Sequence, residues 1–328
     1  MVENTPAGKL KDKERGEGPA IIRHDETFRM GRFLSSLNAA PGGLPAGVGV
    51  GLALGGGFSR GFAHLGVLQV LEQNHIPISC IAGTSVGSIL GAAYASGAPL
   101  ARIIAACRTL RFRDIARWRV SRLGLASNHR LGDLIDRVFE SRRFEDLRIP
   151  VAIVATDLAN GEPVIFKHGD LREAIRASCA FPGLFEPVKI GTRCLADGGL
   201  VAQVPTLAAR GLGAARVVGV SVGLEDGDRG APQNIFQVVA RAVSAAQKHQ
   251  QEVWESHADL MLRPDVQSLA WDDFDRVDEA IEAGAAAARS ALQRIKKLLH
   301  AAEESPYCLQ LRVEGESQSS VWPAEASR

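Results

Sequence analysis

Aromatic residues are scarce in this sequence, and neither sign of charge predominates. Phe, Trp and Tyr make up 5% of the 328 residues, and 38 Lys and Arg residues balance 37 Asp and Glu residues, for a net charge of +1. Proteins that bind nucleic acids need a basic surface for the phosphates and often carry aromatic side chains that stack on the bases. We therefore expect no nucleic-acid partner.

Long apolar runs and paired cysteines are also missing. No stretch approaches the roughly 18 apolar residues that span a membrane, and the charged, polar N-terminal residues are unlike a secretory signal. The five cysteines are scattered, without a C-x-x-C pair, which predicts reduced thiols in a cytosolic protein. We expect a cytoplasmic protein whose contact with a membrane, if there is one, is peripheral and at the inner membrane. The oligomeric state stays open.

Hydrophobic residues make up 46% of the chain, enough for a sizeable core, and they gather in its middle. We expect a mobile N-terminal segment at 1–46, one folded domain over 47–302 and a disordered tail at 303–328. Short apolar runs alternate in the domain with segments of helical periodicity, which predicts an α/β protein with buried parallel strands. Strands are expected at 48–54, 77–82, 151–157, 161–166, 192–196, 216–222 and 259–264, and helices at 62–72, 88–96, 99–110, 131–139, 170–178, 204–211, 232–257 and 274–300.

The run Gly83-Thr-Ser-Val-Gly87 has the pattern G-x-S-x-G between a predicted strand and a predicted helix of small residues. A serine on such a sharp turn presents its hydroxyl at the sheet edge, and the helix N-terminus next to it favours negative charge. Ser85 is therefore a candidate nucleophile. On the pentapeptide alone, a serine that merely caps the helix is an equal alternative.

A second glycine-rich run, Gly55-Gly-Gly-Phe-Ser-Arg-Gly61, follows the first predicted strand and precedes a helix. A dinucleotide site would need glycine where Arg60 stands, and the Gly-Lys-Ser/Thr of a P-loop is missing. A purely structural turn and an oxyanion hole remain. Because neighbouring parallel strands end at the same sheet edge, the loop should face Ser85. We therefore favour an oxyanion hole built from the backbone N–H groups of Gly56, Gly57 and Phe58.

Other side chains near these runs have two interpretations each. Arg60 either anchors the loop or is a solvated charge at the helix start, and His64 is more readily a packed histidine than a catalytic one. Asp197 precedes Gly198-Gly199, so it either turns inward to a site or forms an ordinary Asp-Gly turn.

Two apolar segments are candidates for contact with a substrate. Phe181, Leu184 and Phe185 either line an acyl pocket or pack in the core. Residues 111–130 mix arginines with large apolar side chains. This mixture is typical of a flexible flap over an acyl chain, of an interface, or of an ordinary segment that crosses the surface of the core.

The glycine-rich run, the G-x-S-x-G run and Asp197-Gly-Gly199, in this order, resemble the patatin-like phospholipase family. Arg60–Leu68, Ala177–Phe185 and Asp259–Asp265 add to the resemblance, which covers roughly residues 48–290 and is closest to the bacterial and neuropathy-target-esterase-like branch. It implies a patatin-like three-layer α/β/α fold with a mostly parallel central sheet. Phe58 is a departure, because members of this branch often carry a fourth glycine there.

The resemblance also implies a chemistry. Ser85 would be the nucleophile and Asp197 the general base of a dyad that cleaves lipid esters, phospholipids or lysophospholipids, through an acyl-enzyme, with no metal or cofactor. Aspartate is a weak base, with a usual pKa of about 3.9, so Asp197 must be buried beside the hydroxyl to gain basicity.

Three alternatives stay open. An α/β-hydrolase triad would use His249, His257 or His300 in addition to a serine and an aspartate. A lipid-binding scaffold would have a degenerate site, and a transacylase would pass the acyl group to an alcohol.

Overall fold

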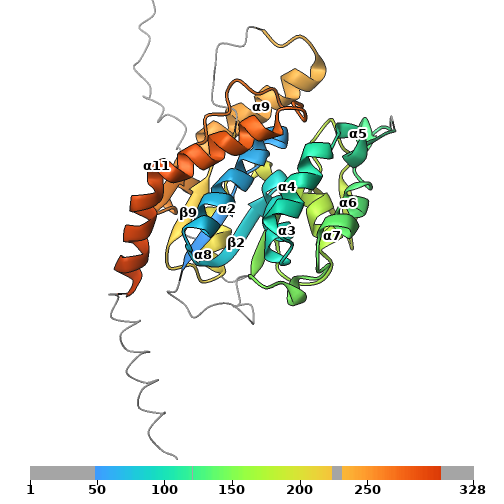
Figure 1. Cartoon of the computed structure of the whole chain (residues 1–328). Helices are drawn as coiled ribbons and strands as arrows, with labels where there is room; N and C mark the ends of the chain where they lie inside the picture. Colours follow the sequence, from blue (N-terminus) through green and yellow to red (C-terminus); the bar gives the residue numbers. More distant parts are fainter. Residues whose placement is uncertain (1–48, 120, 224–230, 304–328) are drawn as a thin grey trace, which may run out of the picture. The chain divides into compact units, whose positions relative to one another are not determined.

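The computed structural model describes residues 49–119, 121–223 and 231–303 (Figure 1). The predicted mobile segment 1–46 lies outside the described residues, and so does the predicted tail, except that the last helix continues to Glu303. No helix in the described ranges combines the length and the apolar character that a bilayer-spanning segment requires.

Eight strands of the described chain form a central sheet in the order β10-β9-β1-β2-β5-β8-β7, with β6 also paired to β5. The pairs from β10 across to β5 are parallel, whereas β6, β7 and β8 run antiparallel to their partners. The mostly parallel sheet is thus confirmed. The strands are β1 (Val50–Leu54), β2 (Ile78–Thr84), β5 (Val151–Asp157), β6 (Pro163–Phe166), β7 (Val188–Ile190), β8 (Arg193–Asp197), β9 (Val217–Val220) and β10 (Leu260–Leu262).

Helices cover both faces of this sheet and give the predicted three-layer α/β/α architecture. Side chains alternate across each strand. Leu52 and Leu54 therefore enter the larger core, with α2, α3, α4, α6, α7 and α11, whereas Ala53 enters a smaller core with α8. The helices are α2 (Ala63–Gln73), α3 (Val86–Ala95), α4 (Leu100–Thr109), α6 (Leu131–Val138), α7 (Leu171–Ser178), α8 (Thr206–Gly211), α9 (Ile235–His249), α10 (Gln251–Ser256) and α11 (Val277–Glu303).

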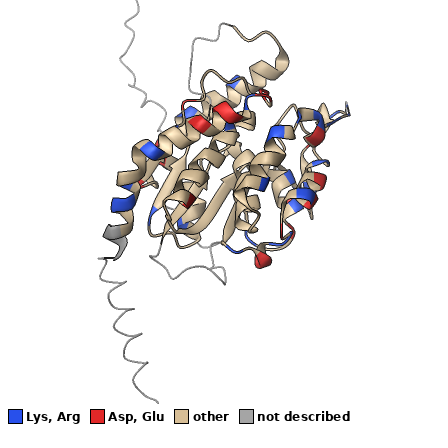
Figure 2. Ribbon diagram, in the orientation of Figure 1, with Lys and Arg blue, Asp and Glu red and all other residues tan. Residues whose placement is uncertain are grey.

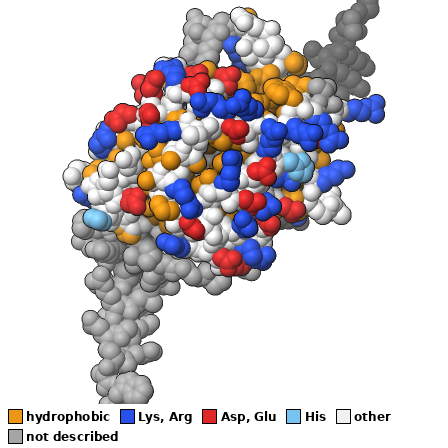
Figure 3. All heavy atoms as spheres, turned by 45° about the vertical axis from the view of Figure 1, so that its right-hand side comes forward, with side chains coloured by type: hydrophobic (Ala, Val, Ile, Leu, Met, Phe, Trp, Pro, Cys, Tyr) orange, Lys and Arg blue, Asp and Glu red, His pale blue; other side chains and the backbone are white. Residues whose placement is uncertain are grey.

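The last helix closes the larger core. Helix α11 lies along α2 (Figure 1), and a Cβ atom on Gly284 would lie 1.8 Å from the carbonyl oxygen of Ala63. The two backbones approach so closely that no other residue fits at this position. The charged residues lie mainly in the helices and loops rather than in the central strands (Figure 2), and apolar atoms stay visible between the charged side chains on the surface (Figure 3).

Two segments differ from the sequence-based expectation. The helix predicted over 232–257 is two helices, α9 and α10, which meet at Gln250. Residues 111–130 contain a short helix, α5 (Phe112–Ile115), and a hairpin of β3 (Arg117–Trp118) and β4 (Ala126–Ser127). No glycine or proline marks the break at Gln250, and α5, β3 and β4 are too short for their periodicity to be recognised in the sequence.

Candidate active site

Ser85 connects β2 to α3 in a conformation that few residues adopt. Its φ of 52° and ψ of −124° are left-handed values that cost on the order of 1–3 kcal/mol outside glycine. The turn is tight because α3 begins directly against β1, where a Cβ on Gly87 would lie 2.1 Å from the carbonyl oxygen of Leu54. The Ser85 side chain makes no capping hydrogen bond to the helix. This sharp strand-to-helix turn is the geometry of a nucleophile elbow.

A buried serine that the sequence did not single out fixes the backbone of Ser85. The Ser85 N–H donates to Oγ of Ser178 at 2.9 Å, and this hydroxyl donates to the carbonyl oxygen of Val154 at 2.6 Å. Oγ of Ser88 donates to the Ser85 carbonyl oxygen at 2.6 Å. Sequence reasoning missed Ser178 because its role depends on α7 lying across β5, which no local pattern encodes.

Strand β5 brings Asp197 to Ser85. Its Val154 pairs with Thr84 at the end of β2, and its next residue, Ala155, pairs with Asp197 at the end of β8. Since β2 runs parallel to β5 and β8 runs antiparallel, the two strand ends meet at this point. The residue after Thr84 is the serine, so the sheet register places the acid beside it.

The Asp197 carboxyl is buried, with 5% of the residue exposed. Its Oδ1 accepts the N–H of Gly199 at 2.8 Å, and its backbone carbonyl accepts the hydroxyl of Thr156 at 2.8 Å. Burial raises the pKa of Asp197 to about 6. The hydrogen bonds from the Gly199 N–H and the Ser85 side chain lower this pKa, but by less than burial raises it. The carboxyl is therefore a stronger base than an exposed aspartate.

The glycine-rich loop leaves two of the three predicted oxyanion donors open. The N–H of Gly56 donates to the carbonyl oxygen of Gln203 at 3.1 Å, so this predicted donor is already engaged, which corrects the expectation for Gly56. Among the described residues, the N–H groups of Gly57 and Phe58 have no hydrogen-bond partner. Phe58 has a φ of 52°, a left-handed value that favours glycine.

Three side chains hold this loop in place. Arg60 is 2% exposed and donates through Nε and Nη2 to the carbonyl oxygen of Leu269 at 2.8 and 2.5 Å, so it anchors the loop. His64 is fully buried with Nε2 2.8 Å from the carbonyl oxygen of Gly55, and burial lowers its pKa to about 4, so it packs as a neutral ring. Gln203, which sequence reasoning also missed, clamps Gly56 because its Nε2 donates to the Gly56 carbonyl at 2.8 Å.

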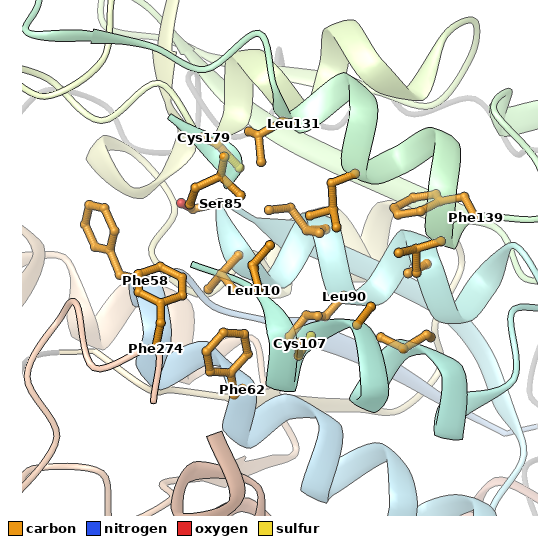
Figure 4. A pocket seen from close by; sticks show the side chains of 18 of the residues that line it. Phe58, Phe62, Ser85, Leu90, Cys107, Leu110, Leu131, Phe139, Cys179 and Phe274 are labelled. Carbon is orange, nitrogen blue, oxygen red and sulfur yellow. The ribbon is translucent and has the colours of Figure 1, made fainter. Parts of the chain in front are cut away.

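A narrow apolar cavity of about 70 Å³ starts at Ser85 and follows α3 (Figure 4). Val86, Ile89 and Ala93 line it from one face of α3, and in Figure 4 Phe139 lies at the opposite end from Ser85. Of the apolar residues predicted to contact an acyl chain, Phe185 lines this cavity, whereas Leu184 is buried in the core cluster beside it.

A second, wider pocket of about 530 Å³ lies on the other side of the serine. It shares Ser85 and Phe58 with the narrow cavity and adds Asp197 and Phe181 to its lining. Helix α9 supplies basic side chains to this pocket, namely Arg241, Lys248 and His249. Ser85 thus lies where an apolar cavity meets a more polar, basic pocket.

The three histidines of the triad alternative lie in different surroundings. His249 lines the wide pocket, whereas Nδ1 of His257 lies 2.6 Å from the carbonyl oxygen of Val253, at the end of α10. The side chain of His300 lies outside the described residues. No group of three or more potential metal ligands is found among the residues that the structure describes.

Residues 52–210 match the family model of patatin-like phospholipases. An uncharacterised NTE family protein of Mycobacterium tuberculosis is 37% identical over 178 residues, which cover 53% of this chain and 49% of that protein. The lysophospholipase NTE1 of Candida glabrata is 27% identical over 326 residues, 90% of this chain and 18% of that protein. Patatin-like phospholipase domain-containing protein 6 of Homo sapiens is 32% identical over 218 residues, 62% of this chain and 15% of that protein.

The chain therefore spans about half the length of the mycobacterial relative and less than a fifth of the other two. The stretch covered by the family model contains the glycine-rich loop, the serine elbow and the aspartate. These are the three segments that the sheet brings together in the structure.

Proposed function

Because the chain belongs to the patatin-like phospholipase family, we propose that it is a serine acyl hydrolase that cleaves the ester bonds of phospholipids or lysophospholipids. The observation that carries the proposal is the Asp197 carboxyl, buried against the Ser85 hydroxyl with a pKa raised to about 6. A base of this kind next to a serine in an elbow is the arrangement that activates a hydroxyl for attack.

In the first half of the reaction, Oγ of Ser85 attacks the acyl carbon and Asp197 takes the hydroxyl proton. The negative charge that develops on the acyl oxygen is stabilised by the open N–H groups of Gly57 and Phe58. The C–O bond to the alcohol then breaks, and the alcohol leaves with the proton from Asp197. Ser85 keeps the acyl group as an ester.

In the second half, a water molecule attacks the acyl carbon while Asp197 removes its proton. The bond between the acyl carbon and Oγ breaks, and the proton returns to Ser85. The products are a free fatty acid and the regenerated serine, so the cycle needs no group beyond these residues and water.

The two cavities supply places for the two parts of such a lipid. An acyl chain fits the narrow apolar cavity along α3, which has few polar atoms to exclude it. The wide pocket carries Arg241 and Lys248, whose positive charge favours a head group that contains phosphate. This division supports a phospholipid or lysophospholipid over a neutral ester. The name lysophospholipase on one relative agrees with it.

A fluorophosphonate tests the proposal, since an activated serine attacks its phosphorus and displaces fluoride. We expect intact-mass spectrometry to show one adduct on the wild-type protein, none on Ser85→Ala and strongly slowed labelling of Asp197→Asn. A folded wild-type protein that never labels would favour the lipid-binding scaffold. Loss of turnover in a folded His249→Ala or His257→Ala variant would favour the triad.

A further inference from the structure

The hairpin of β3 and β4 presents large apolar side chains to the solvent. Trp118 is 65% exposed and Leu123 is 63% exposed. Trp118 ends β3, and Leu123 lies in the loop that leads to β4. The N–H of Arg119 donates to the carbonyl oxygen of Leu125 at 2.9 Å and holds the two sides of this hairpin together. Exposed apolar side chains that gather in one place often mark a contact surface, whereas single ones scattered over a surface are normal.

The same hairpin is strongly basic. Arg117, Arg119 and Arg122 are exposed, and none of the three forms an ion pair with an acidic residue in the part of the chain that the structure describes. Asp114 is the one acidic residue in the sequence from 111 to 130. Figure 2 marks several Lys and Arg residues on the ribbon at this end of the molecule, where α5 is labelled in Figure 1, and Figure 3 shows basic side chains gathered there. We call Arg117, Trp118, Arg119, Arg122 and Leu123 the hairpin surface.

The hairpin is fixed to the wall of the narrow cavity. The N–H of Ala126 donates to the carbonyl oxygen of Leu184 at 2.9 Å, next to Phe185. The Trp118 ring lies 5.8 Å from that of Phe112, which in turn lies 6.2 Å from that of Phe185. Phe185 lines the cavity that begins at Ser85. A chain of aromatic contacts therefore runs from the exposed hairpin to the cavity.

We propose that the hairpin surface docks the protein onto an anionic phospholipid bilayer. Arginine side chains near such a surface are attracted by the lipid phosphates, and a tryptophan finds its preferred place at the level of the head groups. Trp118 and Leu123 enter the apolar boundary while the arginines stay among the head groups. The docking is independent of the catalytic proposal, although it would bring the rim of the narrow cavity to the source of a lipid substrate.

The test is cosedimentation of full-length Ser85→Ala protein, which cannot consume the lipid, with vesicles of phosphatidylglycerol and of phosphatidylcholine. We expect binding to phosphatidylglycerol that weakens as salt is added, and little binding to phosphatidylcholine. Replacing Arg117, Arg119 and Arg122 together with Gln should weaken binding about a hundredfold at low ionic strength, since each arginine contributes to the attraction. Trp118→Ser should weaken it roughly tenfold.

A matched control removes three positive charges elsewhere. Arg289, Arg294 and Lys297 lie on α11, at the other side of the molecule from α5 in Figure 1. Replacing these three with Gln should leave vesicle binding within about twofold of the parent, because the lost charges do not belong to the hairpin surface. Equal binding by the hairpin and α11 triple variants would overturn the proposal, as would a parent protein that does not bind phosphatidylglycerol.

Tryptophan fluorescence locates the contact. Lipids brominated on the acyl chain should quench Ser85→Ala protein on binding, and Trp118→Phe should bind nearly as well but lose most of the quenching. Unchanged quenching in Trp118→Phe would overturn the proposal. If Trp118→Ser instead dissociates a dimer in light scattering while vesicle binding is unchanged, the surface contacts a second copy of this chain rather than lipid. Turnover of a soluble ester by the hairpin variants, with Ser85 restored, should stay at the wild-type level.

Discussion

Thr84 and Asp197 pair with successive residues of strand β5, Val154 and Ala155, although 113 positions separate them in the chain. Strand β5 thereby joins the serine elbow to the aspartate. Both strand ends are fixed by backbone hydrogen bonds, so the sheet register sets the backbone positions of the serine and the aspartate. Catalytic groups held on rigid elements keep their geometry more reliably than groups on loops.

The raised pKa of Asp197 predicts the pH dependence of the reaction. As the general base that we propose, Asp197 must be ionised to accept the serine proton, so kcat/KM should fall as the pH decreases through about 6 and should level off above it. Stopped assays with a soluble short-chain ester, run between a pH of about 8 and about 4, measure this fall in kcat/KM. A rate that stays constant down to the lowest pH would contradict the role of Asp197.

The same pKa predicts that the aspartate costs stability at neutral pH. A carboxyl whose pKa rises from 3.8 to about 6 on folding stabilises the native state fully below the unfolded pKa, and this contribution is lost as the pH rises through 6. Asp197→Asn should therefore be more stable than wild type at neutral pH, by up to about 3 kcal/mol. Urea unfolding should show that the extra free energy of unfolding of Asp197→Asn disappears at a pH below about 4. An equal gain over wild type at neutral and at acidic pH would argue against burial of the charge.

Ser178 is expected to act as a positioning residue. Ser178→Ala removes the acceptor of the Ser85 N–H and the donor to Val154, so the elbow should shift and kcat should fall about ten- to a hundredfold, with KM little changed. Ser96→Ala is the matched control, because Ser96 is also buried and its hydroxyl also accepts one hydrogen bond and donates another. A similar fall in kcat for both variants would indicate a general loss of packing.

Phe58 should matter for stability more than for catalysis. Phe58→Gly relieves a left-handed conformation worth about 1 kcal/mol or somewhat more. It also loses the ring contacts with Phe181 at 5.2 Å and Trp271 at 5.3 Å. Truncating a fully buried phenylalanine costs about 3–5 kcal/mol, which is an upper bound for the half-buried Phe58. Thermal unfolding should show net destabilisation, while the kcat of the folded variant stays within about tenfold because the backbone N–H remains. A loss of kcat far beyond this would mean that the ring, which lines both pockets, positions the ester for attack.

Phe139 should limit the length of the acyl chain. It lines the narrow cavity at the end away from Ser85 (Figure 4), so Phe139→Leu should raise the ratio of kcat/KM for palmitoyl over octanoyl esters several-fold. Phe144→Leu is the control, because Phe144 is equally buried but does not line the cavity. The same change of ratio in both variants would contradict the prediction.

The sequence by itself determined the α/β class, the parallel strands and the chemistry-bearing segments. Apolar runs identify buried strands because both faces of such a strand are covered and leave few positions for polar side chains. The pattern G-x-S-x-G between a strand and a helix made Ser85 a candidate nucleophile, and the structure shows that its turn is tight because Gly87 lies against Leu54. The strands at 151–157 and 161–166 and the helix at 170–178 were likewise predicted, because turn and capping residues act locally.

Tertiary structure alone decided which groups are free to act. The sequence placed Gly56 among the oxyanion donors, but the fold brings Gln203 to its N–H and leaves those of Gly57 and Phe58 open. The pKa of Asp197 depends on burial, and the role of Ser178 depends on α7 crossing β5. These properties arise from contacts between segments far apart in the chain. No local pattern of residues fixes such contacts, because they depend on the strand register and on how the helices pack on the sheet.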